Sequence, residues 1–127
     1  MKTKLIKGLR EVYSKYDAFF IDLWGVIHNG IQIYPGAIDV LENLNKLNKR
    51  FVLISNAPRP SKSVEKYLIK LKMDKNFLNN LVTSGEAALQ TLKNNIYGEK
   101  FYHLGPKRDE DLIKGFEKNQ TSLDKCD

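Results

Sequence analysis

The sequence predicts an α/β protein built on a doubly wound parallel sheet. Short apolar runs, each the length of a buried strand, recur along the chain at 17–23, 50–55, 80–84 and 100–105. Segments with helical spacing of apolar residues separate these runs, at 37–48, 61–71 and 84–95. Crossover connections of this length join parallel strands, so we expect helices on both faces of the sheet.

The composition predicts one globular domain. Of the 127 residues, 42% are hydrophobic and 28% are charged, which is ordinary for a soluble protein. The sequence has no apolar stretch long enough to cross a bilayer, and its start lacks the apolar core of a secretory signal. The single cysteine, Cys126, can form no internal disulfide. We therefore expect a cytoplasmic protein without a membrane partner.

The net charge of +6 does not by itself predict a nucleic-acid partner. The positive residues are mostly lysines scattered over every segment. They form no arginine-rich stripe and no basic groove interleaved with aromatic residues. We therefore expect no nucleic-acid binding.

The chain divides into three parts. Apolar residues recur at helical spacing over 3–15, so residues 1–16 are assigned to an N-terminal helix. Residues 17–117 form the partial α/β core. The last segment, 118–127, has no periodicity and is expected to be an unstructured tail.

The first half of the core begins with the apolar, aromatic-rich strand 17–23, in which Asp22 follows Ala-Phe-Phe-Ile. Residues 24–36 are expected to be a loop, because glycine-containing turn signals interrupt the segment repeatedly. A helix over 37–48 follows, with valine and leucine on one face.

The second strand, 50–55, ends before Pro58 and Pro60, which forbid its continuation. Ser61 is expected to cap the helix that follows.

The third strand, 80–84, ends in two hydroxyl residues. Thr83 and Glu86 have the spacing of a capping box, so these hydroxyls are expected to start a helix rather than serve a site. A fourth strand over 100–105 and a short helix around 112–116 complete the expected core.

Polar residues at the strand ends predict a site. In an open parallel sheet, ligands bind just beyond the carboxyl ends of the strands. Asp22 ends the first strand and Ser55-Asn56 the second, beside a loop in which Gly25 offers a backbone N–H. Hydroxyls and loop amides suit a phosphate, and a carboxylate serves as a nucleophile or as a ligand for a hard cation.

Four segments carry a resemblance to a known family: FFIDLWGVIHNG, VLISNAPRP, LVTSGEA and YHLGPKRDEDL. They resemble the haloacid dehalogenase superfamily of hydrolases. Within it, the likeness is to the capped p-nitrophenylphosphatase-like branch (class IIA) and its Asp-x-Trp-Gly-Val subgroup. The resemblance implies a Rossmann-like core, of which only the N-terminal portion is matched, so we expect an incomplete core without its cap domain.

The resemblance also implies residue roles. Asp22 matches the aspartate that attacks phosphorus and binds Mg²⁺, and the backbone carbonyl of Trp24 matches a second metal ligand. Ser55 matches the hydroxyl that holds the phosphoryl group, with Asn56 beside it and Gly25 in the neighbouring loop. The implied ligand is a phosphorylated small molecule, and the implied cofactor is Mg²⁺.

Trp24 departs from the family pattern. Phosphatases of the superfamily usually have a second aspartate two residues after the nucleophile, which protonates the leaving alcohol. An indole cannot transfer a proton in this way. His28 lies in the same loop and titrates near neutrality, so it is a candidate acid/base, although a hydrogen bond within the turn is the simpler interpretation. His103 is expected to be structural.

The later motifs of the family are not matched either. The family's lysine and its second acidic pair have no counterpart here, and the acidic cluster at 107–112 is expected to favour a helix start instead. Mg²⁺ would then be weakly held and the phosphoryl charge uncompensated. We therefore expect a truncated, phosphatase-type hydrolase that is inactive alone.

Three other interpretations remain open. In the first, the chain is one half of a split hydrolase that a separate C-terminal half completes. In the second, it is a non-catalytic module that binds a phosphoryl ligand. A dehalogenase-type hydrolase, in which Asp22 displaces a halide from carbon, would need neither Mg²⁺ nor the missing acid.

Overall fold

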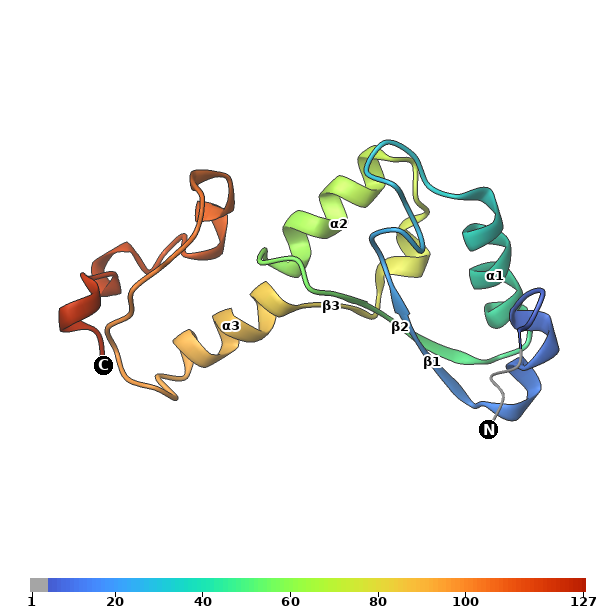
Figure 1. The fold of residues 1–127 in the computed structure, drawn as a ribbon, viewed down its shortest axis with the longest axis horizontal. Helices are drawn as coiled ribbons and strands as arrows, with labels where there is room; N and C mark the ends of the chain where they lie inside the picture. Colours follow the sequence, from blue (N-terminus) through green and yellow to red (C-terminus); the bar gives the residue numbers. More distant parts are fainter. Residues whose placement is uncertain (1–4) are drawn as a thin grey trace.

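The computed structural model describes residues 5–127 and contains a three-stranded parallel sheet in the order β1-β2-β3 (Figure 1). The strands are β1 (Ala18–Asp22), β2 (Arg50–Ser55) and β3 (Leu81–Thr83). The α-helices are α1 (Pro35–Lys46), α2 (Ser61–Lys70) and α3 (Ser84–Lys93). This arrangement confirms the predicted α/β class and its parallel sheet.

Helices α1 and α2 lie on the same face of the sheet (Figure 1). Successive right-handed crossovers that move in one direction across a sheet place their helices on one face. Leu41 and Leu44 of α1 and Leu68 of α2 accordingly share one core with Phe51 and Leu53 of β2. The second helical layer expected of a doubly wound sheet is not present among residues 5–127.

The opposite face of the sheet is apolar and uncovered. Phe20 is 78% exposed, and Ile54 and Val82 are 44% and 46% exposed. Phe20 pairs in register with Val52, and Ile54 with Val82, so these side chains share one face. This face agrees with an incomplete core, because apolar sheet faces are normally packed against another layer.

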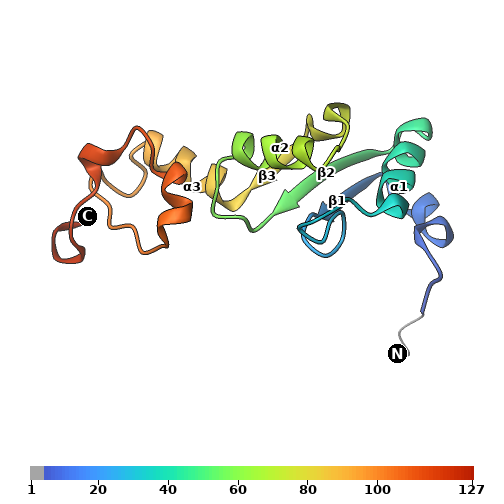
Figure 2. The same ribbon diagram turned by 90° about the horizontal axis from the view of Figure 1, so that it is seen from above.

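The C-terminal third lies beyond the sheet. Helix α3 points away from it, and residues 96–127 gather at the far end of the molecule from the N-terminal turns (Figures 1 and 2). The fourth strand expected over 100–105 is not formed. Phe101 makes only an isolated bridge to Gln120, because α3 carries this segment too far from β3 for pairing.

Several expected helices are shorter than predicted. The N-terminal segment forms 3₁₀ turns at Leu9–Glu11 and Tyr13–Lys15 instead of one α-helix, and residues 1–4 of that prediction lie outside the described residues. The segment Lys107–Leu112 is a 3₁₀ helix, whereas a helix was expected around 112–116. Helices this short are marginal, because the first hydrogen-bonded turn is costly to form, and 3₁₀ turns are common in such short segments.

The segment 118–127, expected to be unstructured, contains a 3₁₀ turn at Leu123–Lys125. The Asp127 carboxylate accepts hydrogen bonds from the backbone N–H groups of Glu99 and Lys100, at 2.8 and 2.7 Å. None of the helices within residues 5–127 is long and apolar enough to span a membrane.

Candidate functional site

The carboxyl ends of β1 and β2 lie side by side, as the sequence predicts. Asp22 pairs in register with Ile54, the residue before Ser55, and Ser55 pairs with Thr83 at the end of β3. Asp22 is exposed, and its Oδ1 accepts a hydrogen bond of 2.8 Å from the Leu23 N–H. The two polar strand ends therefore lie on neighbouring strands, one register position apart.

A cavity of about 520 Å³ opens beside these strand ends. Ser55 and Asn56 line it, together with Trp24 and His28 from the loop after β1. Asp22 is not among the lining residues, although Leu23 and Trp24, which follow it, are. The cavity has the size of a small-molecule site.

The donors near this cavity differ from the expected set. The Ser55 Oγ accepts from the Ala57 N–H at 3.2 Å, so its own hydroxyl hydrogen stays available to a ligand. The Gly25 N–H, expected to face a phosphate, instead donates to the His28 carbonyl at 2.8 Å. Gly25 adopts φ 78°, and its role here is to close the turn.

His28 is held in the turn as a neutral imidazole. Its side chain is buried at 4% exposure, and its Nδ1 accepts a hydrogen bond of 3.0 Å from the Gly30 N–H. Burial lowers the pKa of His28 below its ordinary value, and the nearby Asp22 charge opposes this only in part. An accepting Nδ1 places the ring hydrogen on Nε2, so His28 carries one remaining donor.

Aromatic rings border the same cavity. Trp24 is 65% exposed, and its ring centroid lies 6.2 Å from that of His28. Tyr67 of α2 packs edge-on against His28 at 5.8 Å, and its hydroxyl donates to the Gly30 carbonyl at 2.7 Å. These contacts attach the loop after β1 to α2.

The start of α3 fixes the loop between β2 and α2. As predicted, the Thr83 Oγ1 caps α3 by accepting from the Glu86 N–H at 3.0 Å. The Glu86 carboxylate does not complete the expected reciprocal bond. It accepts instead from the Ser61 N–H at 3.1 Å, and Ser61 is the first residue of α2 rather than its cap. The N-cap position of α2 is taken by Pro60, whose fixed φ suits a helix start.

A partly buried ion pair at the cavity was not predicted from the sequence. Arg59 Nε lies 3.2 Å from Asp109 Oδ1, and Arg59 Nη2 donates to the Arg108 carbonyl at 2.9 Å. The Asp109 side chain is only 8% exposed. Asp109 was expected to favour a helix start, yet its carboxylate pairs with a loop 50 residues earlier in the chain.

The described residues do not form a metal site on their own. Within 5–127, no three carboxylate, histidine or cysteine side chains gather where they could hold a metal ion. Asp22 is then the one carboxylate that the resemblance assigns to Mg²⁺. Mg²⁺ requires near-octahedral oxygen ligation, so these residues fit it only as part of a larger set of ligands.

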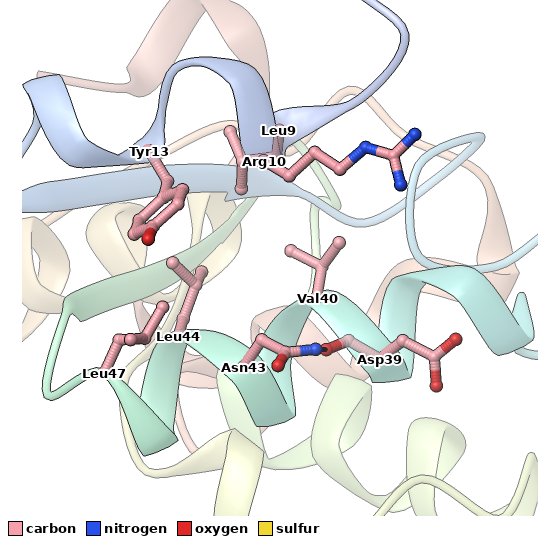
Figure 3. Close-up of a pocket in the computed structure, with 8 residues that line it drawn as sticks. All are labelled: Leu9, Arg10, Tyr13, Asp39, Val40, Asn43, Leu44 and Leu47. Atoms are coloured by element: carbon pink, nitrogen blue, oxygen red, sulfur yellow. Dashed lines mark hydrogen bonds between the residues drawn. The ribbon is translucent and has the colours of Figure 1, made fainter.

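A second cavity, of about 290 Å³, lies between the N-terminal turns and α1 (Figure 3). Apolar side chains such as Leu9, Leu44 and Leu47 form much of its wall, and Arg10 and Asp39 border it (Figure 3). It includes none of the strand-end residues. We therefore place the candidate site at the cavity lined by Ser55 and Asn56.

Comparison with known proteins decides the family. The sequence profile of a family described as haloacid dehalogenase-like hydrolase matches residues 19–117. The chain belongs to this family. The match covers β1 from Phe19 onward, the Ser55-Asn56 strand end and the turn that contains Arg108, so the resemblance carried by the four motifs is confirmed. No curated protein matches the chain.

Solved structures of haloacid dehalogenase-like proteins share this fold. A hydrolase of the family from Brucella suis 1330 has a TM-score of 0.78 and 28% identity, covering 96% of this chain and 44% of its own length. A possible sugar phosphatase from Cytophaga hutchinsonii has a TM-score of 0.71 at 16% identity, covering 94% of this chain and 42% of its own.

A 4-nitrophenylphosphatase from Thermotoga maritima has a TM-score of 0.58 at 24% identity, covering 80% of this chain and 39% of its own. At these identities the last two comparisons show the fold alone. The chain spans less than half the length of each of these structures.

Proposed function

We propose that this chain carries the phosphoryl-binding part of a phosphatase-type hydrolase. The observation that supports this most is the cavity beside the strand ends, where Ser55 keeps a hydroxyl hydrogen to donate and Asn56 adds an amide. Ser55 is the last residue of the apolar strand β2 and Asn56 follows it, as in the family motif. A phosphate monoester is the ligand class that these donors suit.

Asp22 is the proposed nucleophile. It lies on the strand next to Ser55, and as a carboxylate it has the chemistry to form an aspartyl-phosphate. Asp22 and the Trp24 carbonyl are the proposed protein ligands for Mg²⁺. Since these are few, we expect Mg²⁺ to bind weakly to this chain alone.

By itself the chain is proposed to bind its ligand without rapid hydrolysis. Trp24 replaces the usual acid/base, which contributes about 10²–10⁴-fold in rate in enzymes that have one. His28 is held neutral, with its Nδ1 occupied by Gly30, so it is poorly suited to protonate a leaving group. We propose that full activity needs the polypeptide corresponding to the rest of the relatives' length, as a continuation or as a separate half.

The experiment that tests the proposed function is a melting curve of the chain with and without inorganic phosphate, repeated with added Mg²⁺. We expect a cooperative transition that phosphate shifts upward, because a ligand that binds only the folded state stabilises it. Ser55→Ala is expected to abolish the shift, and Ser122→Ala, a serine outside the cavity, is expected to retain it. A shift that is absent in the wild type would contradict the proposal.

A second candidate is a non-catalytic phosphoryl-binding module. The observation in its favour is that Asp22 does not line the cavity, whereas Ser55 and Asn56 do. Two results would favour this module. Asp22→Asn would bind a phosphate ester as the wild type does, and addition of a separate C-terminal half would produce no hydrolysis of 4-nitrophenyl phosphate. Hydrolysis that appears when the C-terminal half is added, and that is lost in Asp22→Asn, would favour the hydrolase.

A further inference from the structure

Two arginines border the cavity at the strand ends. Arg59 lies in the loop between β2 and α2, and Arg108 lies in the 3₁₀ turn Lys107–Leu112. Among the described residues that line this cavity, Asp109 is the one carboxylate. Two guanidinium groups therefore face the cavity against one lining carboxylate.

The two arginines are engaged to different degrees. Arg59 is bound on two sides, by the Asp109 carboxylate at 3.2 Å and by the Arg108 carbonyl at 2.9 Å. Arg59 therefore attaches the 107–112 turn to the β2–α2 loop. Its charge is largely balanced by Asp109, whose side chain is 8% exposed.

Arg108 keeps most of its hydrogen-bonding capacity. Its ion pair with Asp109 is long, with Nε 3.8 Å from Oδ2, and its side chain is 79% exposed. A guanidinium has five N–H donors in a planar fork that matches the oxygens of a phosphate. A buried carboxylate that is already paired with Arg59 keeps this second guanidinium close to the cavity.

We propose that Arg108 is the cationic contact of a phosphoryl group bound against Ser55 and Asn56. Asp109 and Arg59 are positioning residues that hold the Arg108 turn beside the cavity. This inference rests on the proposed function and adds to it a source of positive charge from this chain. The ligand class is a dianionic phosphate or phosphate monoester, because hydroxyl, amide and guanidinium groups all donate to its oxygens.

The test uses inorganic phosphate titrated into the full chain at constant ionic strength. Trp24 is the only tryptophan of the sequence and lines the cavity, so its fluorescence reports on the site, with ³¹P NMR line broadening as an independent measure. Arg108→Gln is expected to weaken phosphate binding about tenfold, the size of one charge-assisted hydrogen bond. Arg108→Lys is expected to recover part of the loss, because it restores the charge but not the fork.

Arg10→Gln is the matched control, because it removes the same charge from an exposed position outside this cavity. It is expected to leave the phosphate affinity unchanged. Circular dichroism melts check that Arg108→Gln folds, which we expect for so exposed a side chain.

The outcomes separate the two proposals. Phosphate binding that is equal in Arg108→Gln and the wild type would overturn the role of Arg108 and leave the proposed function intact. Equal weakening in Arg10→Gln and Arg108→Gln would also overturn it, since net charge alone would then explain the effect. No phosphate binding by the wild type would overturn both.

Discussion

Gly85, the second residue of α3, lies directly against the backbone of Arg59. A Cβ atom at Gly85 would collide with the nitrogen and the carbonyl group of Arg59. The Gly85 N–H donates to the Ala57 carbonyl at 3.1 Å, and the Thr83 hydroxyl donates to the Arg59 carbonyl at 2.6 Å. The start of α3 therefore sets the path of the loop that carries Asn56 and Arg59 into the site.

Gly85→Ala is expected to lower the free energy of unfolding by about 1–3 kcal/mol, as overpacking in a close contact usually does. The clash involves backbone, which cannot move aside as a flexible side chain would. Gly36→Ala is the control, because Gly36 lies in α1 with open space around its Cα. Urea denaturation of both variants measures the difference, and equal stability of the two would contradict the close approach.

Asp109→Asn is expected to loosen the C-terminal third from the site. Removing the carboxylate leaves Arg59 without its charge partner, which is expected to cost about 1–2 kcal/mol because Arg59 is partly exposed. Asp111→Asn makes the same charge change at an exposed position of the same turn. Hydrogen exchange over residues 100–127 is expected to be faster in Asp109→Asn only, and faster exchange in both variants would refute the ion pair's role.

The sequence predicts the sheet well because the strand signals are local. The strand predicted over 50–55 agrees with β2 to the residue, because the unbroken apolar run Phe51–Ile54 is typical of a strand in a parallel sheet. The 100–105 run carries a similar signal and fails, because a strand also needs a neighbour. Whether the 100–105 segment can reach a neighbouring strand depends on the direction of α3, and the sequence of that segment does not predict this direction.

The site is predictable in part for the same reason. Asp22, Ser55 and Asn56 are placed by the rule that ligands bind at strand ends, and the structure brings these ends together. The Arg59–Asp109 pair depends on how the chain returns after α3. The Pro-Arg-Pro sequence at 58–60 does not predict this ion pair. The acidic cluster at 107–112 was already explained by the preference for acidic residues at a helix start.

The pH dependence of stability is expected to follow His28. Burial lowers its pKa in the folded state, while the unfolded chain keeps the ordinary value of 6.5. As the pH falls through that value, the unfolded chain takes up a proton that the folded chain does not, so the folded state loses stability. The loss continues until the pH reaches the lowered folded pKa.

Urea midpoints measured between about pH 8 and pH 5.5 would show this loss in the wild type. His28→Asn, whose amide oxygen can accept from the Gly30 N–H in place of Nδ1, is expected to remove most of it. His103→Gln changes the other histidine and is expected to retain it. A loss of stability that disappears in His103→Gln and persists in His28→Asn would assign the effect to His103 and contradict the prediction.

Phe19 and Phe20, adjacent in β1, are expected to differ in how much their truncation changes the free energy of unfolding. Phe19 packs against the core, whereas Phe20 is 78% exposed on the uncovered face of the sheet. Phe19→Ala is expected to lower the free energy of unfolding by about 2–3 kcal/mol, less than for a fully buried phenylalanine because Phe19 is only partly buried. Phe20→Ala is expected to change it by less than about 1 kcal/mol, because little packing is lost.

The same pair tests what the uncovered face does in solution. β1 is an edge strand in the sheet of the described residues, and its exposed apolar face favours contact with another surface. Phe20→Ala is therefore expected to reduce self-association, measured by sedimentation velocity over a range of concentrations, while Phe19→Ala increases it by populating unfolded chain. Self-association that Phe20→Ala leaves unchanged would mean that the apolar face is not the contact.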